Sequence, residues 1–358
     1  MKLAVIGCGY WGPNLIRNFF QIPYCTELVC CDLDHKKLER MRKLYPAIHA
    51  TNDVDDILKD PEIQGVAIAT PVHTHHVLGE MVLQNDKHLF VEKPLAASTK
   101  NCARLIELAR EKGKVLMVGH TFEYTAAVNK IKEIIDSGEL GNILYVSSTR
   151  VNLGLFQPDI NVIWDLAPHD ISIINYVLGK TPLAVNAQGT AHFNKSIEDV
   201  ATVTLNYDNG VVAFLHVSWL DPNKIRRTTF VGSKKMLVYN DIEVQEKIKI
   251  YDKGVEAPPY YDTYAEFQFS YRYGDIYIPK LDEYEPLRYQ LTHFLECVQN
   301  NMVPRSDGYC GLKVVSALEA AEKSIKSNGK FTPIVYKDLA NYPILCGNGN
   351  QQAVAARD

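Results

Sequence analysis

The sequence lacks the paired cysteines of metal-binding and redox motifs. Its eight cysteines stand apart from any C-x-x-C spacing, at Cys8, Cys25, Cys30, Cys31, Cys102, Cys297, Cys310 and Cys346. Zinc-ribbon and thioredoxin-like sites are therefore excluded. Cys30 and Cys31 lie inside an apolar run, as buried thiols do, and this usage is typical of a reducing cytoplasm.

Long apolar segments and a strong net charge are also missing. No uninterrupted apolar run reaches the roughly 18 residues of a membrane-spanning helix, and the run at residues 2–6 is too short for the core of a signal peptide. The formal net charge is −4, with 22% charged residues, which offers no overall attraction to nucleic acid or to an anionic membrane. We expect a cytoplasmic protein that binds neither, and whose small-molecule substrate meets local polar groups.

The first third of the chain alternates short apolar runs with amphipathic stretches. The apolar runs at 2–6, 27–32, 66–70, 88–94 and 115–120 predict buried strands, and the stretches between them predict helices. Such alternation indicates a parallel sheet with helices on both faces. The length of 358 residues favours a second domain after it.

A glycine motif, G-x-G-x-x-G, follows the first predicted strand and opens the next helix. Gly7 permits a tight turn, Gly9 lets the backbone approach a pyrophosphate, and Gly12 lets helix and strand pack closely. The free N–H groups of the helix would then hold the phosphates. This placement predicts a dinucleotide-binding domain.

Asp32 ends the second predicted strand, about 20 residues beyond the glycines, where an acid hydrogen-bonds the ribose hydroxyls of NAD. The same carboxylate would repel the 2′-phosphate of NADP, so NAD is favoured over NADP. An alternative is that Asp32 caps the following helix, although Asp34 could also do this.

Beyond about residue 120 the pattern changes to antiparallel strands. Asn209-Gly210 between two alternating runs is a strong hairpin signal, and the tyrosine-rich stretch 260–279 is typical of a loop and an edge strand. We expect an α+β domain with an open, mostly antiparallel sheet. Its uncovered face favours a homodimer or homotetramer. The expected boundaries are 1–120, 121–335 and a C-terminal tail at 336–358, whose last dozen residues are expected to be disordered.

Polar residues that could take part in catalysis or ligand binding lie at three places in the sequence. Lys93 ends a predicted central strand, and the stretch 70–76 lies on the same rim, where open parallel sheets place ligands. Asp165 and His169 stand at the start of an apolar helix, as a polar cap, a metal pair or an acid–base pair. Pro168 favours a helix that begins there, which would leave Asp165 outside it.

A metal site at the histidines of 70–76 is not expected. His75 and His76 are adjacent, so their side chains would diverge on a helix.

The motifs GCGYWG, ATPVHTHH, VEKP, SGELGNI and DLAPHDISIINYVLG resemble those of the Gfo/Idh/MocA family, named for glucose–fructose oxidoreductase and inositol dehydrogenase. The resemblance extends to about residue 333. It implies an α/β protein: an N-terminal Rossmann domain joined to a C-terminal α+β domain with an open sheet. It also implies that Lys93 is catalytic and that Asp165 and His169 match the family's D-x-x-x-H pair.

Cofactor contacts follow from the glycine motif and from the resemblance together. The expected residues are Gly7, Gly9, Tyr10, Trp11, Gly12, Asp32, Thr70, Pro71, His75, Glu92 and Lys93. Oxidation of a secondary alcohol needs a base while hydride leaves for nicotinamide, and a histidine with a pKa near 7 suits that exchange. Whether Lys93 or His169 takes the proton stays open.

The resemblance is greatest to enzymes that act at C3 of nucleotide-linked sugars, such as UDP-N-acetylglucosamine 3-dehydrogenases. Arg150, Asn152 and His169 are the expected substrate contacts. The alternatives are a dehydrogenase of free sugars or inositols, a deoxysugar ketoreductase, and a non-catalytic NAD-binding relative. Retention of Lys93, Asp165 and His169 argues against the last.

Overall fold

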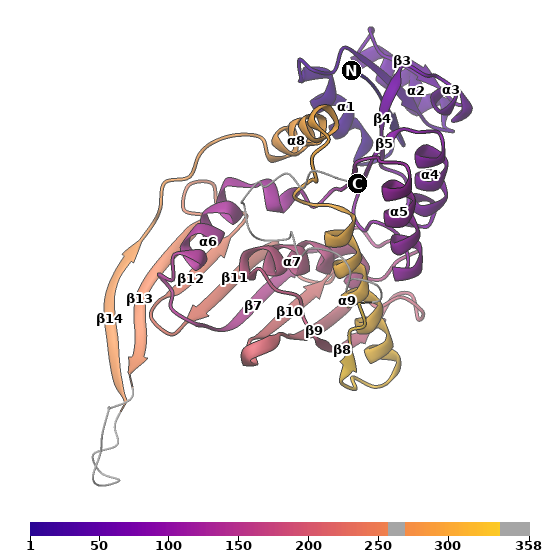
Figure 1. Cartoon of the computed structure of the whole chain (residues 1–358). Coiled ribbons are helices and arrows are strands. Elements are labelled where there is room, and N and C mark those ends of the chain that lie inside the picture. The colour runs from indigo at the N-terminus through magenta and orange to yellow at the C-terminus, as the bar shows by residue number, and fades with distance from the viewer. Residues whose placement is uncertain (257–268, 337–358) are drawn as a thin grey trace, which may run out of the picture. The chain divides into compact units, whose positions relative to one another are not determined.

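The computed structural model describes residues 1–256 and 269–336 (Figure 1). The chain divides into two compact units. Among the described residues, the first unit comprises Met1–Thr125 and Tyr284–Ser316, and the second comprises Ala126–Glu283 and the residues from Ala317 onward. Residues 260–268 of the expected tyrosine-rich stretch and nearly all of the expected tail lie outside the described residues. The rest of that stretch contains the expected edge strand.

The first unit is built on a parallel sheet of order β3-β2-β1-β4-β5-β6. Its strands are β1 Lys2–Ile6, β2 Glu27–Cys31, β3 His49–Thr51, β4 Ile63–Ile68, β5 His88–Val91 and β6 Leu116–Val118. This is the strand order of dinucleotide-binding doubly wound folds. The predicted Rossmann domain is confirmed, and the sequence pattern missed only the short edge strand β3.

Helices connect these strands as crossovers. They are α1 Gly12–Gln21, α2 His35–Leu44, α3 Asp55–Leu58, α4 Val72–Gln84 and α5 Thr99–Glu111, and a 3₁₀ turn η1 Thr121–Tyr124 follows β6. Several predicted strands end earlier than expected. Asp32, Thr70 and Lys93 therefore lie in loops at the carboxyl ends of β2, β4 and β5.

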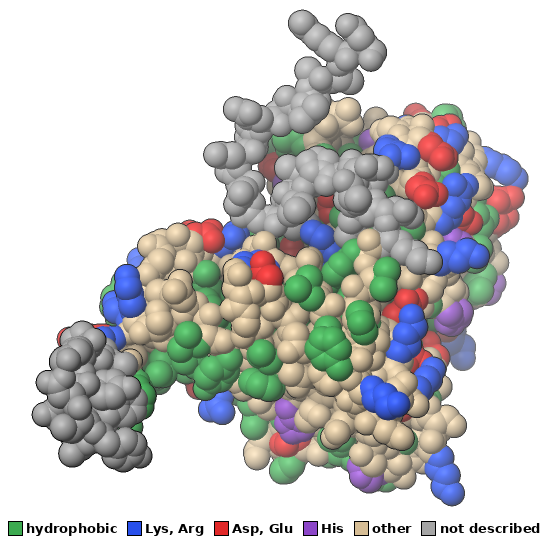
Figure 2. Space-filling view, turned by 60° about the horizontal axis from the view of Figure 1, so that its bottom comes forward, with side chains coloured by type: hydrophobic (Ala, Val, Ile, Leu, Met, Phe, Trp, Pro, Cys, Tyr) green, Lys and Arg blue, Asp and Glu red, His purple; other side chains and the backbone are tan. Residues whose placement is uncertain are grey.

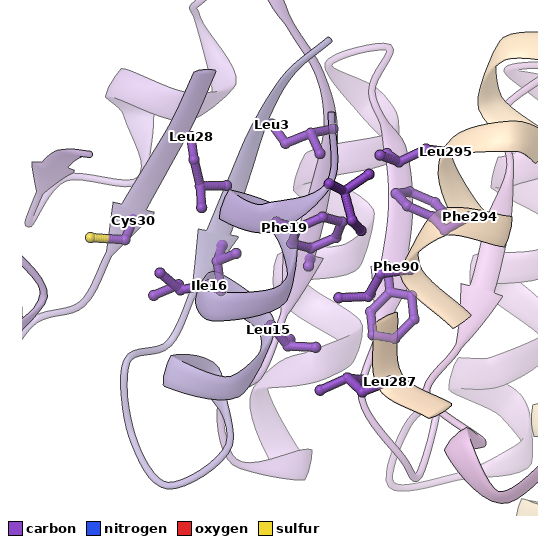
Figure 3. Close-up of a cluster of buried hydrophobic side chains, with 14 of the residues drawn as sticks. Leu3, Leu15, Ile16, Phe19, Leu28, Cys30, Phe90, Leu287, Phe294 and Leu295 are labelled. Carbon is purple, nitrogen blue, oxygen red and sulfur yellow. The ribbon is translucent and has the colours of Figure 1, made fainter. Parts of the chain in front are cut away.

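The helix α8 Pro286–Asn300 completes the core of this unit (Figure 3). Its apolar face is buried with residues of the sheet and of α1, and the rings of Phe294 and Phe90 lie 5.9 Å apart in an edge-to-face arrangement. The expected domain 121–335 differs from this arrangement, because a segment nearly 300 residues from the N-terminus supplies part of the first core.

Phe294→Ala removes a fully buried ring and is expected to lower the free energy of unfolding of the first unit by about 3–5 kcal/mol. Denaturant unfolding measures this. The matched change Gln299→Ala, on the exposed side of α8, is expected to be nearly neutral. A small effect of Phe294→Ala would contradict the assignment of α8 to this core.

The second unit contains a nine-stranded sheet of order β14-β13-β12-β11-β7-β10-β9-β8-β15. The strands are β7 Ile143–Val151, β8 Ala184–Thr190, β9 Val200–Asn206, β10 Val212–Ser218, β11 Ile225–Gly232, β12 Met236–Asn240, β13 Ile248–Glu256, β14 Ser270–Tyr277 and β15 Thr332–Pro333. Of the described strand pairs in this second sheet, only β7 and β10 run parallel. The expected open, mostly antiparallel sheet is confirmed, and Asn209 and Gly210 form the predicted turn with positive φ.

Helices α6 Ala126–Asp136 and α7 Val162–Leu178 lie on one face of this sheet, and α9 Gly308–Lys326 continues from one unit into the other (Figure 1). The alternating pleat of β7 directs Val146, Ser148 and Arg150 toward the helices. The opposite face exposes Tyr145 and Phe214, and apolar side chains gather there in Figure 2. In the described part of the chain, no helix combines the length and apolar character needed to cross a membrane.

Candidate active site

The glycine turn between β1 and α1 has the shape that a pyrophosphate needs. Gly7 adopts φ +99°, and a Cβ there would lie 2.7 Å from the carbonyl oxygen of Ala69. A Cβ at Gly12 would lie 1.8 Å from the Gly7 carbonyl oxygen, whereas one at Gly9 would meet nothing within 4 Å. The open side at Gly9, in front of the first turn of α1, fits a phosphate group.

Asp32 is fixed against this turn. Its Oδ2 accepts a hydrogen bond from the Cys8 N–H at 2.7 Å, and its Oδ1 accepts one from the Asp34 N–H at 2.9 Å. Asp34 caps α2 by accepting from the Lys36 N–H, so the alternative that Asp32 is the helix cap is wrong. Oδ1 also lies 3.5 Å from Nζ of Lys37, and the remaining acceptor capacity of the carboxylate suits the hydroxyls of a ribose.

Tyr10 and Trp11 project from the glycine turn, with exposed fractions of 87% and 36%. Both side chains are accessible to a ligand bound at the turn. Pro71 is exposed as well, and Thr70 lies half-buried beside the turn.

His75 differs from these residues because it lies inside the protein, with 1% of its surface exposed. Its Nδ1 lies 2.8 Å from the Pro94 carbonyl oxygen and its Nε2 lies 2.8 Å from the Thr70 carbonyl oxygen. Burial lowers the pKa of the ring. The imidazole therefore joins the loops after β4 and β5, and the structure does not support the expected direct contact with a cofactor.

Lys93 follows β5 and precedes Pro94 through a cis peptide bond. It is half-buried, whereas its neighbour Glu92 is buried. Burial raises the pKa of Glu92 to about 7, although the Lys93 ammonium opposes this rise. Because the Glu92 carboxyl points into the protein, only its backbone is available for the expected cofactor contact.

His120 is a buried residue that the sequence patterns did not assign to the site. It follows β6 at the same edge of the sheet, and burial together with the Lys93 charge lowers the pKa of its ring to about 3. Its position directly after a predicted strand of the sheet is the signal that could have identified it.

In the second unit, α7 carries Asp165 and His169 on one face. The helix begins at Val162, where the Asn161 side chain caps it by accepting from the Trp164 N–H at 3.1 Å. Pro168 lies inside the helix, so the expectation that the helix starts at Pro168 is wrong. Residues four positions apart are neighbours on a helix surface, and the two half-buried side chains form an i, i+4 pair.

The side chain of Asp165 is held by Trp219, which follows β10. The indole Nε1–H donates to Oδ2 of Asp165 at 3.0 Å, and Trp219 is 1% exposed. A hydrogen bond from a buried indole fixes the orientation of this carboxylate.

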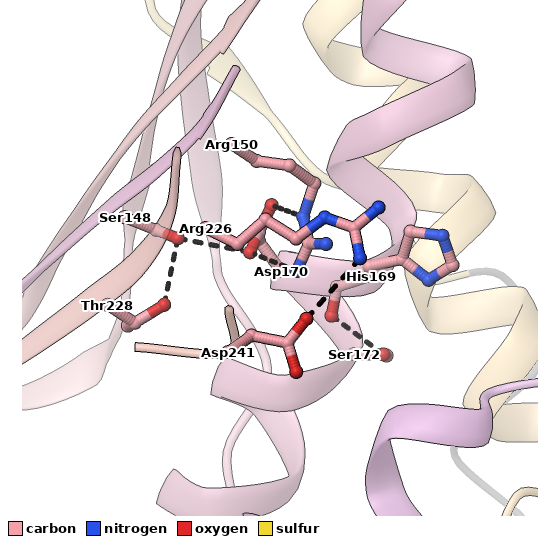
Figure 4. A network of polar contacts seen from close by, with 8 residues as sticks. All are labelled: Ser148, Arg150, His169, Asp170, Ser172, Arg226, Thr228 and Asp241. Carbon is pink, nitrogen blue, oxygen red and sulfur yellow. Dashed lines mark hydrogen bonds and ion pairs between the residues drawn. The ribbon is translucent and has the colours of Figure 1, made fainter. Parts of the chain in front are cut away.

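Arg150 on β7 forms a buried ion pair with Asp170 on α7 (Figure 4). Its Nε donates to Oδ2 of Asp170 at 2.7 Å, and its Nη2 donates to Oδ1 at 3.0 Å. Ser148 adds a third hydrogen bond to the carboxylate at 3.0 Å. The buried guanidinium joins the helix to the sheet, so the structure does not support the expected substrate contact by Arg150.

A second arginine lies beside this pair on the sheet. Arg226 is the cross-strand partner of Arg150 and pairs with Asp241 at 3.3 Å. Each guanidinium therefore has its own carboxylate. Asn152, the remaining expected substrate contact, is half-buried just after β7.

Asp170→Asn leaves a buried guanidinium without its charged partner and is expected to cost about 3–5 kcal/mol of stability. The second unit should unfold at a lower denaturant concentration, as measured by circular dichroism. The control Asp208→Asn breaks an exposed ion pair with Lys180 and is expected to cost less than about 1 kcal/mol. Equal effects of the two changes would contradict the stabilising role of the buried Arg150–Asp170 ion pair.

The chain was also compared with known proteins. Residues 1–120 match the model described as "Oxidoreductase family, NAD-binding Rossmann fold", and residues 128–238 match the GFO/IDH/MocA C-terminal domain. Both models describe one family, and together they cover more than half of the chain. The chain belongs to the Gfo/Idh/MocA family of oxidoreductases. The expected family, the enzymatic class and NAD as cofactor are thereby confirmed.

Relatives in this family include dehydrogenases of different sugars and polyols. A UDP-N-acetylglucosamine 3-dehydrogenase of Acidithiobacillus ferrooxidans is 28% identical over 72% of this chain and 79% of its own length. The scyllo-inositol 2-dehydrogenase (NAD(+)) of Bacillus subtilis is 25% identical over 85% of this chain and 88% of its own length. The family members thus leave the substrate unresolved.

A solved structure has the same fold. The WlbA dehydrogenase of Bordetella pertussis, in complex with NADH and UDP-GlcNAcA, superimposes with a TM-score of 0.75 at 20% identity, over 94% of this chain and 99% of that one.

Proposed function

We propose that this protein oxidises a secondary alcohol of a sugar, at C3 of a nucleotide-linked sugar such as UDP-N-acetylglucosamine, with NAD as hydride acceptor. The observation that carries the proposal is the placement of Lys93 at the carboxyl end of β5, in the unit that binds NAD. Ligands of doubly wound sheets bind at that edge.

The first unit would hold NAD through the glycine turn. Gly7, Gly9 and Gly12 shape the backbone around the pyrophosphate, and Asp32 accepts hydrogen bonds from the ribose hydroxyls. Side chains at the turn and at the end of β4 border the dinucleotide: Tyr10, Trp11, Thr70 and Pro71. When bound, the nicotinamide supplies an electrophilic carbon that accepts hydride.

Lys93, Asp165 and His169 would supply the acid–base chemistry. The amine of Lys93 or the imidazole of His169 removes the hydroxyl proton, and a positive charge at Lys93 stabilises an oxyanion. Asp165, oriented by Trp219, accepts a hydrogen bond from the ring of His169 or from a sugar hydroxyl.

Similarity supports two substrate classes. The relative named UDP-N-acetylglucosamine 3-dehydrogenase and the WlbA complex favour a nucleotide-linked sugar, whereas the inositol dehydrogenase favours a free polyol. Asn152 and His169 are the proposed substrate contacts in either case. A substrate panel of UDP-sugars, free sugars and inositols, monitored by NADH absorbance, tests the choice. Turnover with inositols alone would overturn the nucleotide-sugar assignment.

The exposed apolar face around Tyr145 and Phe214 supports a further part of the proposal. Contiguous apolar surface on a sheet favours self-association, so we propose that the protein forms a homodimer or homotetramer. We also propose that it acts in the cytoplasm.

Lys93→Met and His169→Asn are each expected to lower turnover by at least about 10²-fold, the contribution of a positioned acid–base group. NAD affinity, measured by fluorescence titration without sugar, should stay within a few-fold of wild type. Either variant retaining near-normal rates would show that its side chain does not have the proposed role.

Asp32→Ala removes the carboxylate that meets the ribose and is expected to relax the preference for NAD toward NADP. The ratio of kcat/KM for the two cofactors measures this. As a control, Asp34→Ala removes the cap of α2 and should leave that ratio unchanged. An unaltered ratio in Asp32→Ala would contradict the proposed contact.

A further inference from the structure

Two buried side chains beside Lys93, Glu92 and His120, carry polar atoms that have no hydrogen-bond partner among the described residues. Glu92 is 8% exposed and His120 is 1% exposed. In the part of the chain that the structure describes, Oε1 of Glu92 and both ring nitrogens of His120 have no hydrogen-bond partner. A buried polar atom without a hydrogen-bond partner destabilises the fold, so such groups call for an explanation in function.

The Glu92 carboxyl is held in a defined place. Its Oε2 accepts a long hydrogen bond, 3.3 Å, from the backbone N–H of Lys93. The carboxyl also packs against Gly119, where a Cβ would lie 2.6 Å from Oε2. The absence of a side chain at position 119 therefore leaves the space that the carboxyl occupies, at the adjoining carboxyl ends of β5 and β6.

The two groups differ in their ability to hold a proton. Burial raises the pKa of Glu92 to about 7, and the Lys93 ammonium, a hydrogen bond from the Trp11 side chain and one from the Lys93 backbone N–H only partly offset this rise. Burial and the charge of Lys93 lower the pKa of the His120 ring to about 3, so this ring is neutral near pH 7. Of the two, only Glu92 exchanges a proton in the neutral range.

We propose that Glu92 is the internal proton acceptor behind Lys93. This inference rests on the proposed function, and on the alternative there in which Lys93 rather than His169 takes the hydroxyl proton as hydride leaves the sugar. The Lys93 ammonium then transfers one proton to the Glu92 carboxylate, which leaves a neutral amine and a protonated carboxyl. Release of that proton to water restores the carboxylate. Glu92 acts through Lys93 and touches no reacting atom.

Glu92→Gln tests the proposal because the amide has nearly the same shape but cannot take up a proton. In the wild type, the single-turnover rate of sugar oxidation should fall as pH drops below about 7, since protonation removes the acceptor. In Glu92→Gln this inflection should disappear, and the rate at pH 8 should fall at least about tenfold. NAD affinity should remain within a few-fold of wild type.

A measurement independent of turnover accompanies the rates. Infrared spectroscopy of the enzyme without cofactor should show a protonated carboxyl that titrates near pH 7 in the wild type and is missing in Glu92→Gln. Glu92→Asp, which keeps a titratable group, should retain a carboxyl signal and an inflection. His120→Asn should retain the inflection, because the ring is neutral throughout this pH range.

The outcomes separate the two proposals. An unchanged inflection in Glu92→Gln, with Lys93→Met inactive, would overturn the role of Glu92 and leave the proposed function intact. Turnover in Lys93→Met would overturn the proposed function and this inference with it. If Glu92→Gln does not fold, the wild-type infrared titration decides, and no carboxyl titrating near pH 7 would overturn the inference.

Discussion

A charge inside a protein must be paired or neutralised, because removing it from water costs several kcal/mol. Arg150 and Asp170 satisfy this requirement with two direct hydrogen bonds between β7 and α7. That pair fixes the rotation of α7 against the sheet. Asp165 and His169 lie on the same helix, so the surface they present depends on it.

Beside Lys93, the pairing of buried polar groups is incomplete. Glu92 keeps an unpaired oxygen, and His120 keeps two unpaired nitrogens among the described residues. Completed pairing accompanies a structural role in the ion pair of Arg150 and Asp170. Incomplete pairing accompanies the position where the sugar hydroxyl is proposed to lose its proton.

Local sequence patterns predicted the parts of the molecule that depend on neighbouring residues. The turn at Gly7, the cap alternative at Asp34 and the hairpin at Asn209 follow from backbone conformation and short-range hydrogen bonds. Contacts between distant residues were not predictable in this way. Arg150 resembles a ligand-binding residue until Asp170 is seen opposite it, and α8 carries no sign that its partners lie near the N-terminus. The expectation from Pro168 was wrong because the Asn161 side chain caps the helix, which starts at Val162, before Pro168.

The central proposal is that Lys93 and His169 take part in the oxidation of a sugar hydroxyl while Arg150 stays with Asp170. A crystal structure of the enzyme with NAD and a UDP-sugar tests it most directly. The account predicts the reacting oxygen within about 3 Å of the Lys93 amine and the His169 ring, with Arg150 still bound to Asp170. A sugar held by Arg150, or either proposed acid–base group turned away from the reacting oxygen, would contradict it.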